Sequence, residues 1–237
     1  MRMRLLLAFT LTAMVAVPSN AATDTMIRRL LRFWGLTANP GQMKGPGDDF
    51  ASGDIWLVSL GGTPAPLTAA GGYNSPVFSP VDGSLLALKG GAVVRIPGGG
   101  GTSVAVRKIP GALKLVGFDG ENPDEVAVLM DSDVPSPLAI LSLKSGKVTP
   151  IPYDRKAEDE RGMLAQIRGQ QRVYGDATLY IKTESKRGIA GTIEWTDVYL
   201  QRGSAAPQNV SACDGVNCGQ PALSPDRRKV AFVKAGR

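Results

Sequence analysis

The 237-residue chain contains 27 lysine and arginine residues, 21 aspartate and glutamate residues and no histidine, which gives a formal net charge of +6 at pH 7. Without histidine it can form no Ser-His-Asp triad, Cys-His pair or histidine metal site, and it lacks the commonest general base near neutral pH. The mild positive charge favours solubility and weak attraction to anionic surfaces. Because no set of strands combines aromatic and basic residues, we expect no nucleic-acid partner, and no cofactor or metal is indicated.

The first 21 residues have the pattern of a secretory signal peptide. Arg2 and Arg4 precede the apolar run Leu5–Val17, and residues 19–21 are Ser-Asn-Ala, which fits the rule for a cleavage site. We therefore expect cleavage before Ala22 and a mature protein that is periplasmic or secreted. An uncleaved membrane anchor is the alternative, but a bilayer-spanning helix needs about 20 apolar residues.

Residues 22–52 are predicted to form a short amphipathic helix followed by a linker. Over Thr25–Leu36, apolar and basic side chains alternate at helical spacing and so occupy opposite faces. The apolar face consists of Ile27, Leu30, Leu31 and Trp34, and the basic face consists of Arg28, Arg29 and Arg32. Two roles stay open: the helix packs on the rest of the protein, or it docks onto an envelope protein partner or an anionic membrane surface. Thr37–Ser52 has the composition of a Gly/Pro linker.

From Gly53 onward, short apolar segments alternate with turns rich in Gly and Pro, which is typical of all-β proteins. The expected strands fall into groups along the chain. Two strands are expected over Gly53–Thr68, four over Ser75–Ile109, four over Leu113–Ile151, a further set over Gly162–Val210 and two over Gly219–Val233.

One phrase of the sequence occurs twice. Tyr73–Lys89, YNSPVFSPVDGSLLALK, indicates two strands joined by a turn in which proline presets φ, aspartate bonds its own backbone and glycine accepts a positive φ. Gln220–Val233, QPALSPDRRKVAFV, repeats this turn and the strand after it. A unit that recurs at long intervals in a β-rich chain indicates a propeller or another repeat array.

These phrases resemble the repeat of TolB-type β-propellers, a WD-like blade built on Ser-Pro-Asp-Gly and a short apolar strand. The other half of that repeat is a strand of Asp, Ile or Val and an aromatic residue, then a Gly-rich turn and a Leu-Thr ending. Asp54–Leu60 with Leu67-Thr68 resembles it well, and Asp197–Leu200 resembles it in part. The resemblance covers Phe50–Arg237 and specifies a fold better than a function. In TolB-type proteins a segment before the propeller contributes to partner binding, a role that the resemblance implies for Thr25–Leu36.

The two incomplete strand groups complement each other. Gly219–Val233 supplies the first half of the repeat and Gly53–Thr68 the second, so together they predict one split "velcro" blade that removes open sheet edges. With three whole groups, the expected fold is a four-bladed β-propeller over residues 53–237, with about 46 residues per blade. A six-bladed ring, as in TolB, would leave about 31 residues per blade, too few for four strands and their loops.

Cys213 and Cys218 are the only cysteines and lie five positions apart in a loop rich in Gly, Asn and Asp. In an exported protein this spacing favours a local disulfide. A zinc site is disfavoured, because two thiols without histidine are too few ligands. The acidic stretch Asp119–Glu125 matches no known calcium loop in the order of its ligands, and we expect a solvated hairpin turn there.

The sequence therefore predicts an exported, non-catalytic propeller that acts as a protein-interaction or scaffold module in the cell envelope. No stretch pairs two carboxylates in an obvious cleft. The alternative is an envelope enzyme that uses carboxylates, such as a carbohydrate-active propeller, or a glycan-binding propeller. A third possibility is a propeller that once preceded a catalytic domain of the prolyl-oligopeptidase type.

Overall fold

The computed structural model describes residues 52–119, 122–131, 136, 138–151, 172–189 and 191–235. Within these ranges the protein consists of sixteen antiparallel strands, which confirms the all-β prediction. The expected signal peptide, amphipathic helix and linker lie outside the described residues. In the described part of the chain, no helix is long and apolar enough to span a membrane.

The first and last strands of the described chain share one group, which we name the split group. Its strands follow the order β15 (Cys218–Leu223), β16 (Lys229–Ala235), β1 (Gly53–Ser59) and β2 (Ala65–Pro66). β16 and β1 pair along their whole length, from Gly53 opposite Ala235 to Ser59 opposite Lys229. The two half-repeats, which are separated by most of the sequence, thus form one sheet in which neither β1 nor β16 is an open edge.

Three further groups each contain four strands that are consecutive in the sequence. The second group is β3 (Tyr73–Phe78), β4 (Leu85–Lys89), β5 (Ala92–Ile96) and β6 (Val104–Lys108); the third is β7 (Ala112–Phe118), β8 (Glu125–Met130), β9 (Leu138–Ser142) and β10 (Val148–Pro150); the fourth is β11 (Arg172–Tyr174), β12 (Ala177–Gly188), β13 (Gly191–Arg202) and β14 (Gln208–Asn209). One residue pair, Gly53 opposite Tyr73, also joins β1 to β3.

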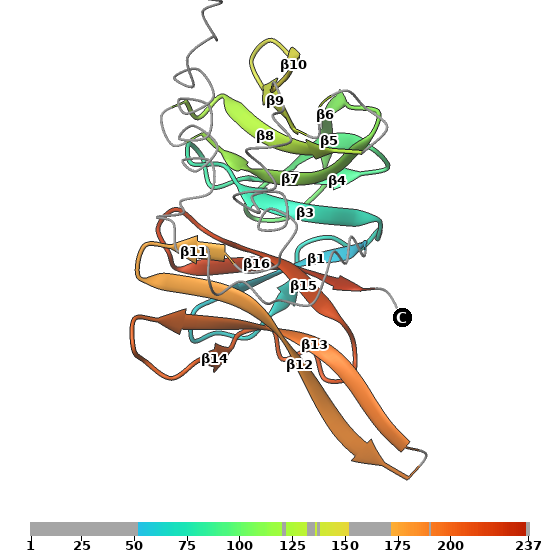
Figure 1. Cartoon of the computed structure of the whole chain (residues 1–237), viewed down its shortest axis with the longest axis vertical. Coiled ribbons are helices and arrows are strands. Elements are labelled where there is room, and N and C mark those ends of the chain that lie inside the picture. The colour runs from blue at the N-terminus through green and yellow to red at the C-terminus, as the bar shows by residue number, and fades with distance from the viewer. Residues whose placement is uncertain are drawn as a thin grey trace, which may run out of the picture.

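The groups are stacked in the order third, second, split and fourth (Figure 1). β3 packs against β7 on one side and β15 on the other, and β15 also packs against β11, β12 and β13. Apolar cores fill these interfaces. Inner strands such as β4 are buried on both faces, because successive side chains point to opposite faces, so that Leu85 enters one core and Leu86 the next. Fully or almost fully buried members are Leu86, Leu115 and Val128 in one core, Ile55, Leu85 and Ala231 in the next, and Leu179, Val198 and Phe232 in the last.

A closed four-bladed ring would need a fourth interface, between the third and fourth groups. These groups lie at opposite ends of the stack (Figure 1). Among the described residues, no strand of the third group packs extensively against a strand of the fourth. The described strands thus form four groups with three interfaces, and their closure into a ring stays a prediction.

Candidate functional site: a hollow between two Ser-Pro turns

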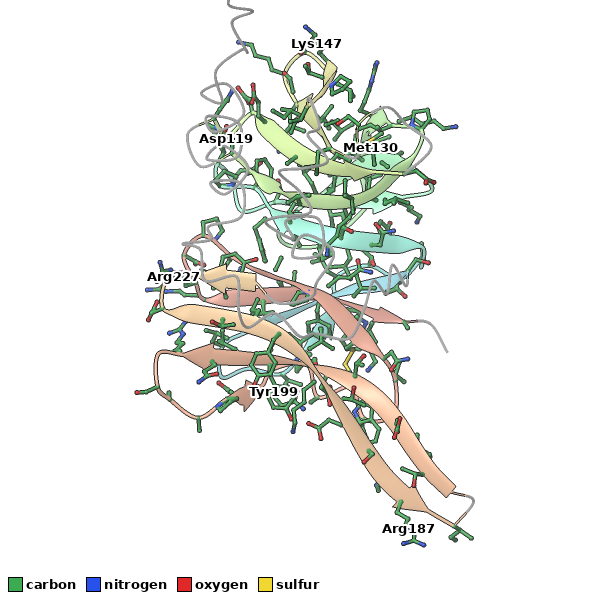
Figure 2. All side chains as sticks on the ribbon, in the orientation of Figure 1. Asp119, Met130, Lys147, Arg187, Tyr199 and Arg227 are labelled. Atoms are coloured by element: carbon green, nitrogen blue, oxygen red, sulfur yellow. A yellow bond between two sulfur atoms is a disulfide. The ribbon has the colours of Figure 1, made fainter. Side chains whose placement is uncertain are left out.

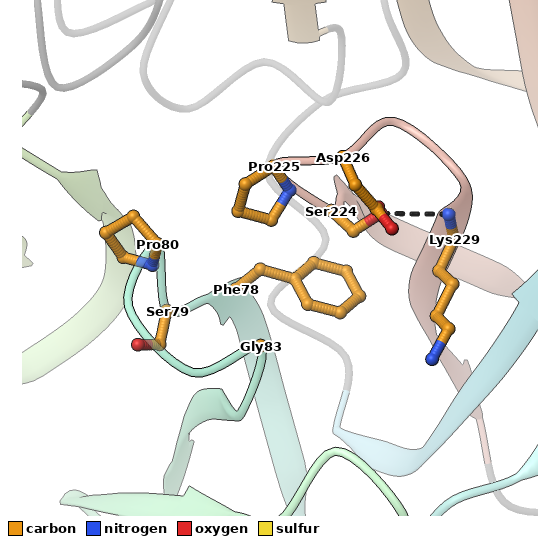
Figure 3. A pocket seen from close by; sticks show the side chains of 8 residues that line it. All are labelled: Phe78, Ser79, Pro80, Gly83, Ser224, Pro225, Asp226 and Lys229. Atoms are coloured by element: carbon orange, nitrogen blue, oxygen red, sulfur yellow. Dashed lines mark hydrogen bonds between the residues drawn. The ribbon is translucent and has the colours of Figure 1, made fainter.

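The two Ser-Pro turns of the sequence lie beside each other and enclose a hollow (Figure 3). One turn connects β3 to β4 and the other connects β15 to β16, and the packing of β3 on β15 brings them together. The hollow has a volume of about 230 Å³, which is below the ~300–1,000 Å³ of most small-molecule pockets. Its walls are Phe78, Ser79, Pro80, Gly83, Ser224, Pro225, Asp226 and Lys229.

Internal hydrogen bonds fix the first turn. The backbone N–H of Ser79 donates to the carbonyl oxygen of Ser84 (2.7 Å), and Asp82 Oδ1 accepts from the hydroxyl (2.7 Å) and the backbone N–H (3.1 Å) of Ser84. Gly83 supplies the φ of 67° that few other residues adopt readily. Hydrogen bonds from Ser84 and Ser79, together with the guanidinium of Arg95 at 3.0 Å, outweigh burial and lower the pKa of Asp82 to about 2.

The second turn has the same closure but a displaced carboxylate. The backbone N–H of Ser224 donates to the carbonyl oxygen of Lys229 (2.9 Å), so both turns close onto the fifth residue after the serine. Asp226 lies one position nearer its serine than Asp82 does, and it accepts from the Ser224 hydroxyl (2.5 Å) and the Arg228 backbone N–H (3.1 Å). These two bonds, in that order, lower the pKa of Asp226.

Arg227 connects the second turn to the fourth group. It takes the positive φ of the second turn, 58°, and lies three residues after Ser224, whereas the first turn uses Gly83, four residues after Ser79. Its guanidinium lies 2.7 Å from Asp176 Oδ1, and its carbonyl oxygen accepts from Arg202 Nη2 (2.7 Å). The ion pair is exposed and by itself worth about 1 kcal/mol or less, but the two contacts fix the position of the turn.

The hollow is lined by apolar and charged side chains together. Phe78 is buried and lies next to Pro225, while the Lys229 side chain is exposed (Figure 3). Asp82 and Asp226 have lowered pKa values and are used in their own turns, whereas an efficient general acid or base needs a pKa near the working pH. Among the described residues, no three His, Cys, Asp or Glu side chains are placed to hold a metal ion.

A second repeated constellation is structural. In the split group, Asp54 Oδ1 accepts from the Thr68 hydroxyl (3.0 Å) and the Gly71 backbone N–H (2.9 Å), and the Thr68 oxygen accepts from the Ile55 backbone N–H (2.9 Å). This network ties the segment after the fourth strand of the group to the start of the third. The Asp and Leu-Thr positions of the repeat are therefore explained by hydrogen bonding within the group.

The fourth group contains the same network around Asp197, again with the hydroxyl fourteen residues later. Asp197 is 2% exposed and accepts from the Ser211 hydroxyl (2.7 Å), the Cys213 backbone N–H (2.7 Å) and Trp195 Nε1 (2.9 Å). Burial raises its pKa, but the three donors outweigh burial and the pKa is lowered. Ser211 was not recognised from the sequence, because Val210-Ser211 replaces the Leu-Thr ending of the repeat.

The predicted disulfide between Cys213 and Cys218 is present, and both residues are buried. Because Cys213 also donates to Asp197, the bond stiffens the loop that completes this network. The acidic stretch lies between β7 and β8, and its residues 120 and 121 lie outside the described part of the chain. The Asp119 backbone N–H donates to the Glu125 carbonyl oxygen (2.9 Å), and Asp119 is buried although a solvated turn was expected there.

The seven candidate partner-binding residues of the amphipathic helix lie outside the described residues, so their role stays a prediction. The hollow was not predicted, although both of its turns were. Its formation depends on the contact of two segments 145 positions apart (224 − 79), and no local pattern encodes that contact.

No family model and no curated protein matches this chain. Among solved structures, it has a coarse likeness to a protein from Agrobacterium tumefaciens described as "putative TolB", with 15% sequence identity and a TM-score of 0.36. The match covers 77% of this chain and 61% of that structure, so this chain spans about three fifths of its length.

Proposed function

We propose that this chain is an exported four-bladed β-propeller that binds a protein partner in the cell envelope and catalyses no reaction. The propeller is supported by four stacked strand groups, by the repeated Ser-Pro turns and by the β16–β1 pairing. Export is supported by the signal-peptide pattern of the first 21 residues and by the disulfide, because such bonds persist in oxidising compartments.

The hollow between the Ser-Pro turns is the observation that carries the binding proposal. Both turns are held by internal hydrogen bonds, so they lose little conformational freedom when a partner binds. Pro80, Pro225 and Phe78 supply apolar walls and Lys229 supplies a cation at the rim. This combination fits one apolar side chain next to an acidic group, as in a peptide loop that carries both.

The non-catalytic role is supported by the lowered pKa values of Asp82, Asp226 and Asp197, each of which accepts hydrogen bonds from neighbouring donors. A carboxylate-based glycosidase needs one carboxyl group with a raised pKa to protonate the leaving group. The enzyme alternative is tested by a screen of the purified protein against glycosides and cell-wall fragments. Turnover that a single carboxylate substitution abolishes would replace the binding proposal.

The binding proposal is tested by pull-down from envelope extract with the mature protein and two variants. Lys229→Glu reverses the charge at the rim of the hollow, and Lys147→Glu makes the same change at the far end of the stack (Figure 2). We expect one defined partner to be captured by the wild type and by Lys147→Glu, and to be reduced about tenfold or more for Lys229→Glu. Equal capture by both variants would contradict this site. Loss of capture on deletion of residues 25–36 alone would assign binding to the predicted helix.

A further inference from the structure

The fourth group contains a hairpin that extends beyond the rest of the protein. β12 and β13 are each twelve residues long, but β11 pairs only with residues 177–179 and β14 only with Tyr199 and Leu200. On β13, Thr196 is the residue nearest the free end of the hairpin that hydrogen-bonds to the body of the protein. Its backbone N–H donates to Asn217 Oδ1 and its hydroxyl donates to the carbonyl oxygen of Cys218. Past this point the strands pair only with each other among the described residues, as far as Gly188 opposite Gly191. We call the exposed residues 185–189 and 191–194 the arm (Figure 1).

Side chains at the base of the arm hold its direction. Tyr199 stacks on Tyr180 with ring centroids 5.8 Å apart, and its hydroxyl donates to Glu184 Oε1 (2.5 Å). Lys182 Nζ lies 2.8 Å from the same carboxylate oxygen and 5.0 Å from the Tyr199 ring centroid. An isolated two-stranded hairpin is marginally stable in water, so this bracing at the base helps the arm to project as a defined element.

The tip of the arm exposes apolar and basic side chains together. Ile189 is fully exposed and Ile193 is 57% exposed. Lys186 and Arg187 are also exposed, and neither forms a salt bridge with another described residue. Glu194 is the one acidic residue beyond the braced Glu184, so residues 185–194 carry a formal charge of +1 (2 − 1).

We propose that this arm docks the protein onto an anionic lipid surface. Ile189 and Ile193 would enter the boundary between headgroups and acyl chains, and Lys186 and Arg187 would contact the lipid phosphates. Basic residues beside exposed apolar ones are the composition of interfacial membrane contacts, and each cation is attracted to an anionic leaflet. Because the arm projects from the body (Figures 1 and 2), its tip reaches a flat surface before the four sheets do.

A protein partner fits this tip less well. A stable protein interface takes about 800 Å² and 20–30 residues from each side, which is more than the arm offers. Addition of a strand to the free edge of β12 is opposed by Lys182, Lys186 and Arg187, since charged side chains of this kind block edge-to-edge pairing. A lipid surface needs neither a large complementary interface nor a free strand edge.

The test is co-sedimentation of the mature full-length protein with vesicles of phosphatidylglycerol and phosphatidylethanolamine, compared with vesicles of phosphatidylcholine alone. One arm variant combines Ile189→Ser with Ile193→Ser, and the other combines Lys186→Glu with Arg187→Glu. The matched control, Lys144→Glu with Lys147→Glu, makes the same change in net charge at the opposite end of the stack, where Figure 2 shows Lys147.

We expect the wild type and the control to bind the anionic vesicles only, and more weakly as salt is raised. Binding of the charge-reversed arm variant should fall about tenfold or more, and the serine variant should also lose binding. Equal binding by all variants would overturn the proposal and point to the predicted N-terminal helix. Equal binding of the wild type to both kinds of vesicle would also overturn it. A wild-type dimer that the serine variant dissolves, without vesicle binding, would show that the arm pairs with a second copy of this chain.

Discussion

Phe232 offers a direct test of the split group, because this side chain of β16 packs in the core between the split and fourth groups. It is 0% exposed and lies opposite Trp56 of β1. A buried phenylalanine removes about 150–250 Å² from water, equivalent to about 4–6 kcal/mol at 25 cal/mol/Å², which is an upper estimate. We expect Phe232→Ala to lower the free energy of unfolding by about 3–5 kcal/mol, the usual range for this truncation.

The change is measured by urea unfolding and by thermal melting of the mature protein. For a protein of this size, about 1 kcal/mol corresponds to a shift in Tm of about 2–4 °C, so Phe232→Ala should melt about 6–20 °C below the wild type. Val104→Ala is the control, because Val104 is 65% exposed on β6. A surface change of this kind should alter stability by less than about 0.5 kcal/mol.

If Phe232→Ala and Val104→Ala had equal stability, β16 would not pack as described. A cross-link then shows whether only the packing of Phe232 is wrong or whether the pairing of β1 with β16 is wrong as well. Ser59 and Lys229 are directly opposite in the β1–β16 pair, where Cα atoms of paired strands are about 4.5–5.5 Å apart. With both native cysteines replaced by serine, Ser59→Cys with Lys229→Cys should form a disulfide, and Ser59→Cys with Lys147→Cys should not. Absence of the first cross-link would refute the pairing itself.

Three further predictions concern the carboxylate networks and the disulfide. Asp197→Asn, which removes the acceptor charge from a buried network, should destabilise the protein by about 1–3 kcal/mol in urea unfolding. Because the folded-state pKa of Asp82 is depressed to about 2, its contribution to stability should be complete above about pH 4. This contribution should be lost as the pH falls toward 2, and Asp82→Asn should flatten that part of the profile of urea midpoint against pH. Exported protein alkylated without reductant should show no labelled Cys213 or Cys218, and serine at both positions should cost about 2 kcal/mol or less, since the loop is short.

Turn chemistry made much of this fold predictable. Ser-Pro phrases with an aspartate mark turns through local hydrogen bonds, and the structure places a turn at each of them. The strands next to these turns were expected for the same reason. In both phrases the serine backbone N–H bonds to the carbonyl oxygen of the fifth residue after it. The aspartates differ in position, because Asp82 is the third residue after its serine and Asp226 is the second. This shift is visible in the sequence, because one residue separates Pro80 from Asp82 whereas Asp226 follows Pro225 directly.

The arm was not predicted, and its composition explains why. Thr178–Lys182 and Ile193–Leu200 were expected as strands because each alternates apolar and polar residues facing a core. Between them the strands continue with both faces in solvent, so no apolar periodicity marks residues 183–192. The part of the hairpin beyond the core is held by pairing between β12 and β13 alone. A hydropathy pattern does not indicate such pairing. Because both faces of the hairpin are solvated, core packing does not explain its exposed isoleucines, Ile189 and Ile193.

The Asp repeat is visible in two groups only, and the tethers in the other two show the reason. In the second group the Ile109 backbone N–H donates to the Gly91 carbonyl oxygen (3.0 Å), so the segment after the fourth strand is tied to the start of the third by backbone alone. In the third group the Ile151 backbone N–H donates to the Leu138 carbonyl oxygen (2.9 Å), and the Ser136 hydroxyl adds a bond to the Ile151 carbonyl oxygen. The split and fourth groups also contain such a backbone bond, from Thr68 to Ile55 (3.2 Å) and from Val210 to Val198 (2.9 Å), and they add the aspartate network to it. Because the backbone bond is common to all four groups, the connection does not require the aspartate, and it is present in the two groups whose sequences lack the Asp repeat.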